Sequence, residues 1–287
     1  RIEMEDGSVF ITANNDGVDQ LHSARGGWFS QASKIEVFHP RLIAFLLAAV
    51  LLVVGFVKYG IPVVAKVAVW ATPQEAIVLI DNSALSTIDR IFTGPSKLPQ
   101  ERKDKLAKGF NELLRGSETN LEARLLFRDG GRMGPNAFAL PAGTVVLTDQ
   151  LAKLATDEEI IAVFAHELAH VRHSHGLQQM YRALGFAGLV TIISGDMGGV
   201  MEELLGGGGL MIAMAASREM ELEADSEAVH LLKKVGRNPA GLGNALDKLM
   251  EEICGDKKAE ACEQTGWLSS HPGGEERRKA LQKAIDG

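Results

Sequence analysis

The chain has 287 residues, which is enough for one main domain and a smaller attachment. Hydrophobic residues make up 46% of the chain and charged residues 23%, a balance that suits a globular protein carrying a membrane segment. The net charge of −7 argues against a protein that binds nucleic acid through a basic surface.

The amino-terminal part divides into a polar segment and an apolar one. Residues 1–38 begin polar and acidic, and residues 8–12 read as a strand, so we expect part of a small β-rich domain here. The run 42–57 carries no charge, and its extension to residue 61 gives a helix of about 30 Å. The alternative is a buried core helix. Because the run has no polar face, we predict a single transmembrane helix over residues 42–61.

Basic residues around this helix give a weak signal for its orientation. Arg25, Lys34 and Arg41 precede the apolar run, and Lys58 and Lys66 follow it. Basic residues are enriched on the cytoplasmic side of a membrane. We therefore expect a cytoplasmic amino terminus, an extracytoplasmic catalytic domain and, if the source is bacterial, an inner-membrane location.

The next segment combines helices with a small sheet. Thr72 and Glu75 have capping-box spacing with Pro73 at the first helical position, so a helix is expected through about residue 92. Residues 99–114 form an amphipathic pattern. Strand-like runs follow, separated by glycine and proline, at residues 121–128, 136–140 and 144–148.

An H-E-x-x-H motif lies in the most strongly helical stretch of the chain. Thr156 and Glu159 form a second capping-box pattern, and an apolar run follows it. His166 and His170 are four residues apart, so both rings project from one face of the helix. Two imidazoles there suit one Zn²⁺, with Glu167 in reach of an attacking water. The alternative is a buried helix with two core histidines, which are costly to bury without a function.

A zinc site of this kind needs a third protein ligand. The metzincin pattern fails, because its glycine position holds His173 and its third-histidine position holds Gly176. We expect His173 and His175 to form a polar end of the motif helix. A glutamate from a second helix is the other solution, and residues 217–225 offer two pairs at i, i+4 spacing: Glu221 with Asp225, and Glu219 with Glu223.

The carboxy-terminal part reads as helices and one loop. Residues 182–194 and 206–216 are apolar but short, and suit core helices or a flap that dips into the membrane. Asn238 and Pro239 suit the start of a helix to about residue 252, and residues 275–285 form the last helix. Cys254 and Cys262 suit either a disulfide or two free thiols, and we favour the disulfide.

Several motifs in order resemble one family. S-R-x-x-E-x-x-A-D at residues 217–225, following H-E-x-x-H, is similar to the gluzincin family of membrane-associated zinc peptidases, which contains the CAAX prenyl proteases, the protease HtpX and a mitochondrial inner-membrane protease. The likeness covers roughly residues 79–287. It includes P-S-K-L at 95–98, N-A-F-A-L-P at 136–141 and W-L-S-S-H-P at 267–272.

The resemblance implies a fold and a set of roles. It implies an α+β, mainly helical, zincin-like domain over residues 72–287, with a small sheet beside the H-E-x-x-H helix. It makes Glu221 the third ligand of one Zn²⁺ and Asp225 the residue that orients His166. It places Asn136, Ala137 and Phe138 on an edge strand that binds substrate, and His271 near the metal as a gate or an oxyanion donor.

The expected function is therefore membrane-anchored zinc endopeptidase action on membrane or misfolded proteins, in quality control of the cell envelope. The expected partners are protein or peptide substrates and a membrane, with no nucleic acid. An alternative is a membrane-tethered, chaperone-like factor whose zinc centre is structural or self-inhibited. A prenyl-protein protease is a weaker alternative, because those relatives enclose their site with several spans and one clear span is seen here.

Overall fold

A computed structural model describes residues 2–3, 9–10, 40–117, 121–195, 216–255, 271 and 275–286. The chain divides into two compact units, residues 1–59 and 60–287. The three-part division into residues 1–38, 42–61 and 72–287 stays a prediction.

The first unit holds a short hairpin-like pair and a long apolar helix. Strand β1 (Ile2–Glu3) pairs antiparallel with β2 (Val9–Phe10), which lies inside the strand expected over residues 8–12. Helix α3 (Pro40–Gly55) is apolar after Arg41, and its side chains are exposed, with Phe45 73% and Leu51 71% accessible. A core helix would bury these side chains, so this exposure contradicts the core-helix alternative and favours a membrane helix.

The helix continues beyond the first unit. A π-helical turn, η1 (Phe56–Gly60), leads into α4 (Ile61–Ala71). Among the described residues, the stretch Arg41–Ala71 is the one helix long and apolar enough to cross a membrane. The helix is thus longer than the expected residues 42–61, because the chain stays helical to Ala71 with Lys66 as the one charged side chain after Lys58.

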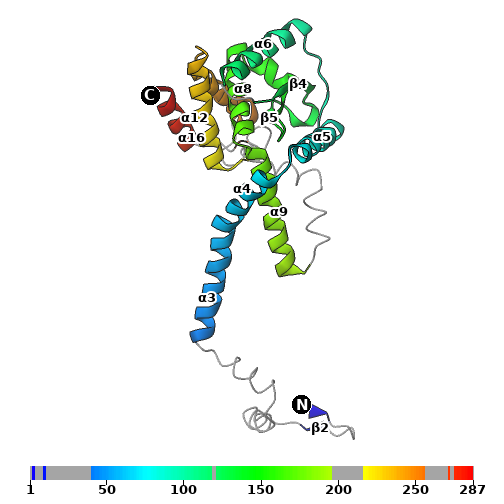
Figure 1. Cartoon of the computed structure of the whole chain (residues 1–287), viewed down its shortest axis with the longest axis vertical. Helices are drawn as coiled ribbons and strands as arrows, with labels where there is room; N and C mark the ends of the chain where they lie inside the picture. Colours follow the sequence, from blue (N-terminus) through cyan, green and yellow to red (C-terminus); the bar gives the residue numbers. More distant parts are fainter. Residues whose placement is uncertain are drawn as a thin grey trace. The chain divides into compact units, whose positions relative to one another are not determined.

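Within the second unit, α4 packs along α9 (His175–Ser194), as Figure 1 shows. The contact is close at Gly185, where an added Cβ would lie 3.2 Å from Ile61 Cγ2. α9 is longer than the expected residues 182–194, and Phe186 and Ile192 near its end are exposed. The described part of α9 therefore does not form a core helix along its second half. Of residues 206–216, all but Ala216 lie outside the described residues.

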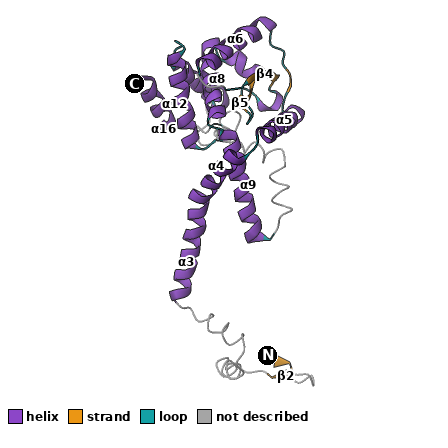
Figure 2. Cartoon of the chain, in the orientation of Figure 1, coloured by secondary structure: helices purple, strands orange, loops and turns teal. Residues whose placement is uncertain are grey.

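The second unit is mainly helical around a small mixed sheet (Figure 2). The strand order is β3 (Gly94–Pro95), β4 (Arg124–Asp129), β6 (Thr144–Thr148) and β5 (Ala137–Ala139). β4 and β6 are parallel, and the other pairs are antiparallel. Among the described residues, β5 is an edge strand, as the resemblance implies for Ala137 and Phe138, and Asn136 lies just before it.

Side chains of β6 alternate between two cores. Val145 and Leu147 belong to a large cluster with α6 (Gln100–Gly116) and α8 (Asp157–Arg172), whereas Val146 packs with Ile88 of α5 (Gln74–Ile91). Helices therefore cover both faces of the sheet, which explains why T-V-V-L-T is buried at every position. Helix α8 packs against β5, β6 and five helices, so the H-E-x-x-H motif lies at the centre of this unit.

Two expected helix starts are corrected. The first concerns Thr72, which is not the cap of α5. Its hydroxyl donates to Ala68 O at 2.6 Å and lies 2.7 Å from Tyr181 Oη. The hydroxyl therefore bonds to the end of α4 and to helix α9, and not to the start of α5. Helix α5 begins at Gln74 with Pro73 as its uncapped N-cap residue, and the expected capping box is wrong.

The second correction is a shift of one residue at the start of α13 (Ala240–Cys254). Pro239 is the N-cap residue, and Asn238 lies one position earlier, where its side-chain oxygen accepts from the Ala240 N–H at 3.0 Å. Cys254 is buried at the end of α13, and Cys262 lies outside the described residues, so the disulfide stays a prediction.

Candidate metal centre

Helix α8 supplies the first residues of the site. The capping box of Thr156 and Glu159 is formed in both directions, as predicted, and fixes the start of the helix. His166 and His170 face one another, with 2.9 Å between their Nε2 atoms. His166 and Glu167 are fully buried, and His170 is 7% exposed. The motif therefore lies inside the protein, in a low-dielectric environment that strengthens its electrostatics.

Helix α12 (Arg218–Lys234) resolves the choice between the two glutamate pairs. Ser217 caps its start by accepting from the Met220 N–H. Glu221 is fully buried and Asp225 is 2% exposed, whereas Glu219 and Glu223 are exposed. The Glu221 and Asp225 pair thus faces the histidines, and the rival pair lies on the outer face of the helix.

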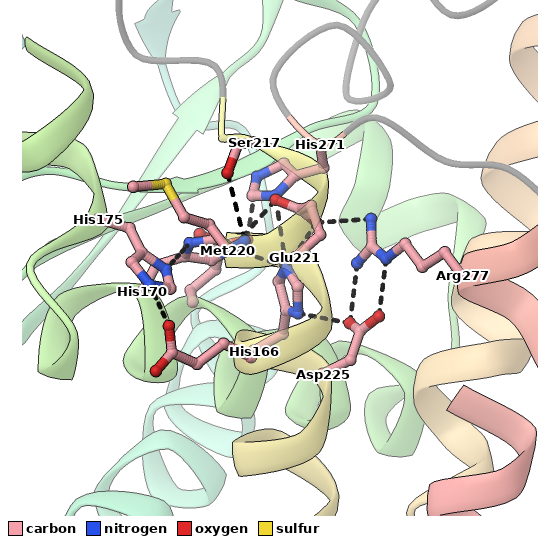
Figure 3. A network of polar contacts seen from close by, with 11 residues as sticks. His166, His170, His175, Ser217, Met220, Glu221, Asp225, His271 and Arg277 are labelled. Atoms are coloured by element: carbon pink, nitrogen blue, oxygen red, sulfur yellow. Dashed lines mark hydrogen bonds and ion pairs between the residues drawn. The ribbon is translucent and has the colours of Figure 1, made fainter. Parts of the chain in front are cut away.

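The three candidate ligands converge on one point (Figure 3). His166 Nε2 lies 3.4 Å from Glu221 Oε2, and His170 Nε2 lies 3.4 Å from Glu221 Oε1. Ligands about 2.0–2.1 Å from a tetrahedral zinc ion lie about 3.3–3.4 Å from one another. Both histidine–carboxylate distances match this separation, and the two histidine nitrogens are closer, at 2.9 Å. Buried donor atoms grouped in this way fit a divalent cation, and these residues would hold it.

Asp225 has the position that the resemblance implies for it. Its Oδ1 lies 2.9 Å from His166 Nδ1, on the side of the ring away from Glu221. A carboxylate at Nδ1 holds the hydrogen there and leaves the Nε2 lone pair free for a metal. Asp225 is therefore well placed to orient His166.

His271 is the fourth residue of the cluster. It is 4% exposed, and its Nδ1 lies 3.1 Å from Glu221 Oε1 and 3.3 Å from His166 Nε2. Its Nε2 lies 3.5 Å from Glu167 Oε1. The donor atoms of His166, His170, Glu221 and His271 all lie within 4.8 Å of one another. The structure thus brings His271 into the metal cluster itself, and not only near it.

Arg277 is a site residue that the sequence reading missed. It comes from the last helix, α16 (Glu275–Asp286), is 6% exposed, and makes two hydrogen bonds to Asp225, at 2.7 and 2.8 Å. Its Nη1 also lies 2.5 Å from Glu221 Oε2. A cation in the first turn of a helix is disfavoured by the helix dipole, so its position there was the one available hint of a buried acidic partner.

The two buried glutamates of the site, Glu167 and Glu221, have pKa values shifted in opposite directions. Burial raises the pKa of Glu167, against the opposing charges of His271 and His166. Burial acts in the same direction on Glu221, but His271 and Arg277 hold the pKa of Glu221 well below its usual range. One glutamate is therefore poised to take up a proton, and the other to stay an anion beside a cation.

The same contacts set the pKa values of Asp225, His166 and His170 before a cation binds. Burial opposes the charge of Asp225, but hydrogen bonds from Arg277 and His166 lower its pKa to about 2. Burial opposes the charge of His166 too, yet Asp225 and Glu221 raise its pKa to about 9. Burial and the neighbouring His166 lower the pKa of His170 to about 3. Removing the charges of Asp225 or Glu221 would therefore change the whole cluster.

Comparison with known proteins identifies the family. The sequence profile described as "Peptidase family M48" matches residues 101–285, which is more than half of the chain. The chain belongs to peptidase family M48. The match includes every candidate site residue described above.

Curated relatives agree with this assignment. Metalloprotease LoiP of Escherichia coli (strain K12) is 32% identical over 152 residues, which cover 51% of this chain and 57% of LoiP. Mitochondrial metalloendopeptidase OMA1 of Arabidopsis thaliana is 32% identical over 151 residues, covering 52% and 29%. A protease HtpX homolog of Campylobacter hominis is 35% identical over 137 residues, covering 40% and 47%. The chain thus spans less than two thirds of the length of each of these relatives.

The family assignment confirms the resemblance read from the motifs. M48 relatives are metalloproteases by name, so a metal is implied at the His and Glu cluster. The mainly helical fold with a small sheet is confirmed as well. The role of each site residue, the identity of the metal and the side of the membrane stay predictions.

The expected substrate-binding residues lie beside the cluster. Ala137 and Phe138 are buried in β5, and β5 packs against α8. Asn136, just before β5, is 1% exposed, and neither polar atom of its side-chain amide has a hydrogen-bond partner among the described residues. A buried amide without a partner is costly, so it suits a residue that binds a ligand.

The expected polar helix end at His173 and His175 is half right. His173 is the C-cap residue of α8, but His175 is the first residue of α9 and is 2% exposed. Ser174 separates them with φ 53°, a left-handed conformation that turns the chain sharply. His175 is thereby directed into the protein.

Proposed function

We propose that this M48 member is a membrane-anchored zinc endopeptidase of the gluzincin type. One observation carries the proposal: two histidines and Glu221 converge on one point, and a second glutamate of opposite pKa shift lies beside them. A purely structural metal site has no use for a buried base next to its ligands. His166, His170 and Glu221 would hold the cation.

Each residue of the chain then has a role in peptide hydrolysis. A bound zinc ion supplies a Lewis acid that polarises a carbonyl and makes water more acidic. Glu167 accepts the proton of the attacking water and gives it to the leaving amine, which its raised pKa favours. Asp225 fixes the tautomer of His166, and Arg277 keeps Asp225 ionised.

Strand β5 is proposed to bind the substrate. Its inner side pairs with β6 and its outer side is an edge, so an extended peptide can add there as a strand. β5 also packs on the helix that carries Glu167, which would bring the peptide backbone to the catalytic residues. The free amide of Asn136 would hydrogen-bond the same peptide.

The membrane helix limits the substrates. The exposed apolar stretch Arg41–Ala71 would hold the chain in a bilayer, so the proposed substrates are membrane or misfolded proteins nearby. Relatives named as proteases or metalloproteases support hydrolysis of proteins as the activity. We propose quality control of the envelope as the biological role, with the catalytic unit on the extracytoplasmic side.

A self-inhibited centre is a second candidate state, and one observation favours it. His271 contributes a donor atom to the same cluster, so it can take the fourth position that a substrate or water needs. In this arrangement His271 is a gate. If it moves aside, the same imidazole can donate to the oxyanion, which is the other role expected for it.

The test is Glu167→Gln in the purified full chain. The variant is expected to bind zinc as wild type does and to lose casein degradation, because an amide cannot take up the proton. Glu158→Gln, on the exposed side of the same helix, is the control and is expected to keep activity. A chelator should abolish wild-type activity. Degradation by Glu167→Gln at the wild-type rate would refute the mechanism.

A further inference from the structure

A second cluster of metal-ligating side chains lies next to the first. It consists of His173 at the end of α8, His175 at the start of α9, and Glu223 on the exposed side of α12. His173 Nδ1 lies 3.3 Å from Glu223 Oε1, and His175 Nε2 lies 3.2 Å from Glu223 Oε2. The two imidazole rings are stacked, with centroids 5.4 Å apart.

These separations suit a divalent cation. Ligands of a tetrahedral zinc ion lie about 3.3–3.4 Å from one another, and the two histidine–carboxylate distances are close to this value. Glu223 is 54% exposed and His173 is 28% exposed, so a cation can enter from solvent and keep water as a further ligand. Imidazole and carboxylate are ligands that zinc and similar metals accept.

His175 also connects this cluster to the catalytic one. Its Nδ1 lies 2.9 Å from His170 Nδ1 (Figure 3). When His170 binds a metal through Nε2, its Nδ1 must carry the hydrogen and donate it. His175 Nδ1 must then accept, so the hydrogen of His175 lies on Nε2 and is donated to Glu223. Both contacts are satisfied in this arrangement, and Glu223 and His175 orient His170 as Asp225 orients His166.

A cation at the second cluster breaks this arrangement. It needs the lone pair of His175 Nε2, so the hydrogen of His175 moves to Nδ1. Two N–H groups, of His175 and His170, then face each other at 2.9 Å. The contact becomes repulsive, and His170 is pushed from its place as a ligand.

We propose that His173, His175 and Glu223 form a second divalent-cation site whose occupation restrains the catalytic centre through His175. Because binding is reciprocal, the catalytic metal also weakens the second site, and the second site fills only at higher metal concentration. Losing the orientation of a metal-binding histidine costs about 10–100-fold in metal affinity or activity. We therefore expect turnover to fall about tenfold or more as the second site fills. The restraint of turnover rests on the proposed peptidase function, whereas the cation site does not.

The test counts zinc in the purified full chain. Metal-stripped protein is titrated with Zn²⁺ by calorimetry, and bound zinc is measured by elemental analysis at a fixed free concentration. Wild type is expected to bind two equivalents, and His173→Ala one. His230→Ala, on the exposed face of α12 and outside both clusters, is the control and is expected to bind two. One equivalent in wild type, or equal binding by the two variants, would overturn the site.

The restraint has two readouts. Peptide hydrolysis at excess zinc, divided by hydrolysis at one equivalent, is expected to be about one tenth or less in wild type and about one in His173→Ala. In parallel, Co²⁺ is loaded as the first equivalent and Zn²⁺ is added as the second; the visible absorption of cobalt is expected to change as His170 shifts. Two bound equivalents without this spectral change would overturn the coupling. Two equivalents with the change, but no hydrolysis at any zinc load, would uphold the second site and refute the proposed peptidase function.

Discussion

Arg277 compensates two buried carboxylates, and its removal should destabilise the catalytic unit strongly. Its guanidinium contacts Asp225 through two hydrogen bonds and Glu221 through a third contact, and all three side chains are nearly inaccessible. Arg277→Met keeps much of the apolar volume but removes the charge. Two carboxylates are then left buried side by side, which is the costly way to break an ion pair.

The magnitude follows from the pKa of Asp225. Its contacts, those with Arg277 first, lower this pKa from 3.8 to about 2, and each pKa unit corresponds to about 1.4 kcal/mol, so about 2 kcal/mol acts at Asp225 alone. Breaking one side of a buried pair typically costs about 3–5 kcal/mol. We expect a loss of about 3 kcal/mol in the metal-free protein, or about 6–12 °C in Tm. A bound zinc ion compensates Glu221, so the loss should be smaller in the loaded protein.

Thermal unfolding of the full chain in detergent, with and without chelator, measures this loss. Arg278→Met is the matched control, because its partner Asp247 and Arg278 itself are more than half exposed and such pairs are worth under about 1 kcal/mol. The folded pKa of Asp225 is depressed, so the difference between wild type and Arg277→Met should be complete above pH 3.8 and shrink as the pH falls towards 2. Equal shifts for the two variants would refute the reasoning.

Three further predictions concern the metal, the gate and the membrane. Glu221→Ala should lower bound zinc by at least about tenfold in affinity while Glu219→Ala leaves it unchanged, and metal analysis that shows equal loss would contradict the assignment of the ligand. His271→Ala should raise basal and self-directed proteolysis if His271 is a gate, or lower turnover by about a hundredfold if it is an oxyanion donor, and unchanged activity would exclude both roles. Residues 42–61 should keep the chain in membranes through alkaline carbonate washing, and release of the chain into the wash would contradict the membrane helix.

Capping-box patterns predicted a helix start correctly only where both partners of the box are free to bond with each other. The box of Thr156 and Glu159 formed as expected, because both partners lie within one turn. The same spacing at Thr72 failed, because Tyr181, more than a hundred residues later, and the end of α4 occupy the hydroxyl. A pattern of neighbouring residues cannot predict this contact, because Tyr181 reaches Thr72 only when α4 packs against α9.

In the candidate site too, spacing along one helix predicted some residues, and packing between helices decided the others. His166, Glu167 and His170 follow from helical spacing, since they share one helix and one face. Glu221 and Glu223 are both plausible by spacing, and only burial separates them. Arg277 was not predicted, because its partners lie on α12 and the one hint in its own helix is a cation in the first turn.

The two glutamates of the centre show why residue type alone does not give a role. Glu167 and Glu221 are both fully buried, and desolvation pushes both towards the neutral form. Arg277 reaches Glu221 and keeps it an anion. Glu167 lies on the other helix, and its neighbour is His271, with 3.5 Å between Glu167 Oε1 and His271 Nε2. In the closed arrangement, one imidazole would thus fill the fourth position at the cation and also lie against the base. Movement of His271 would therefore admit water to the cation and leave Glu167 free to accept the proton of that water.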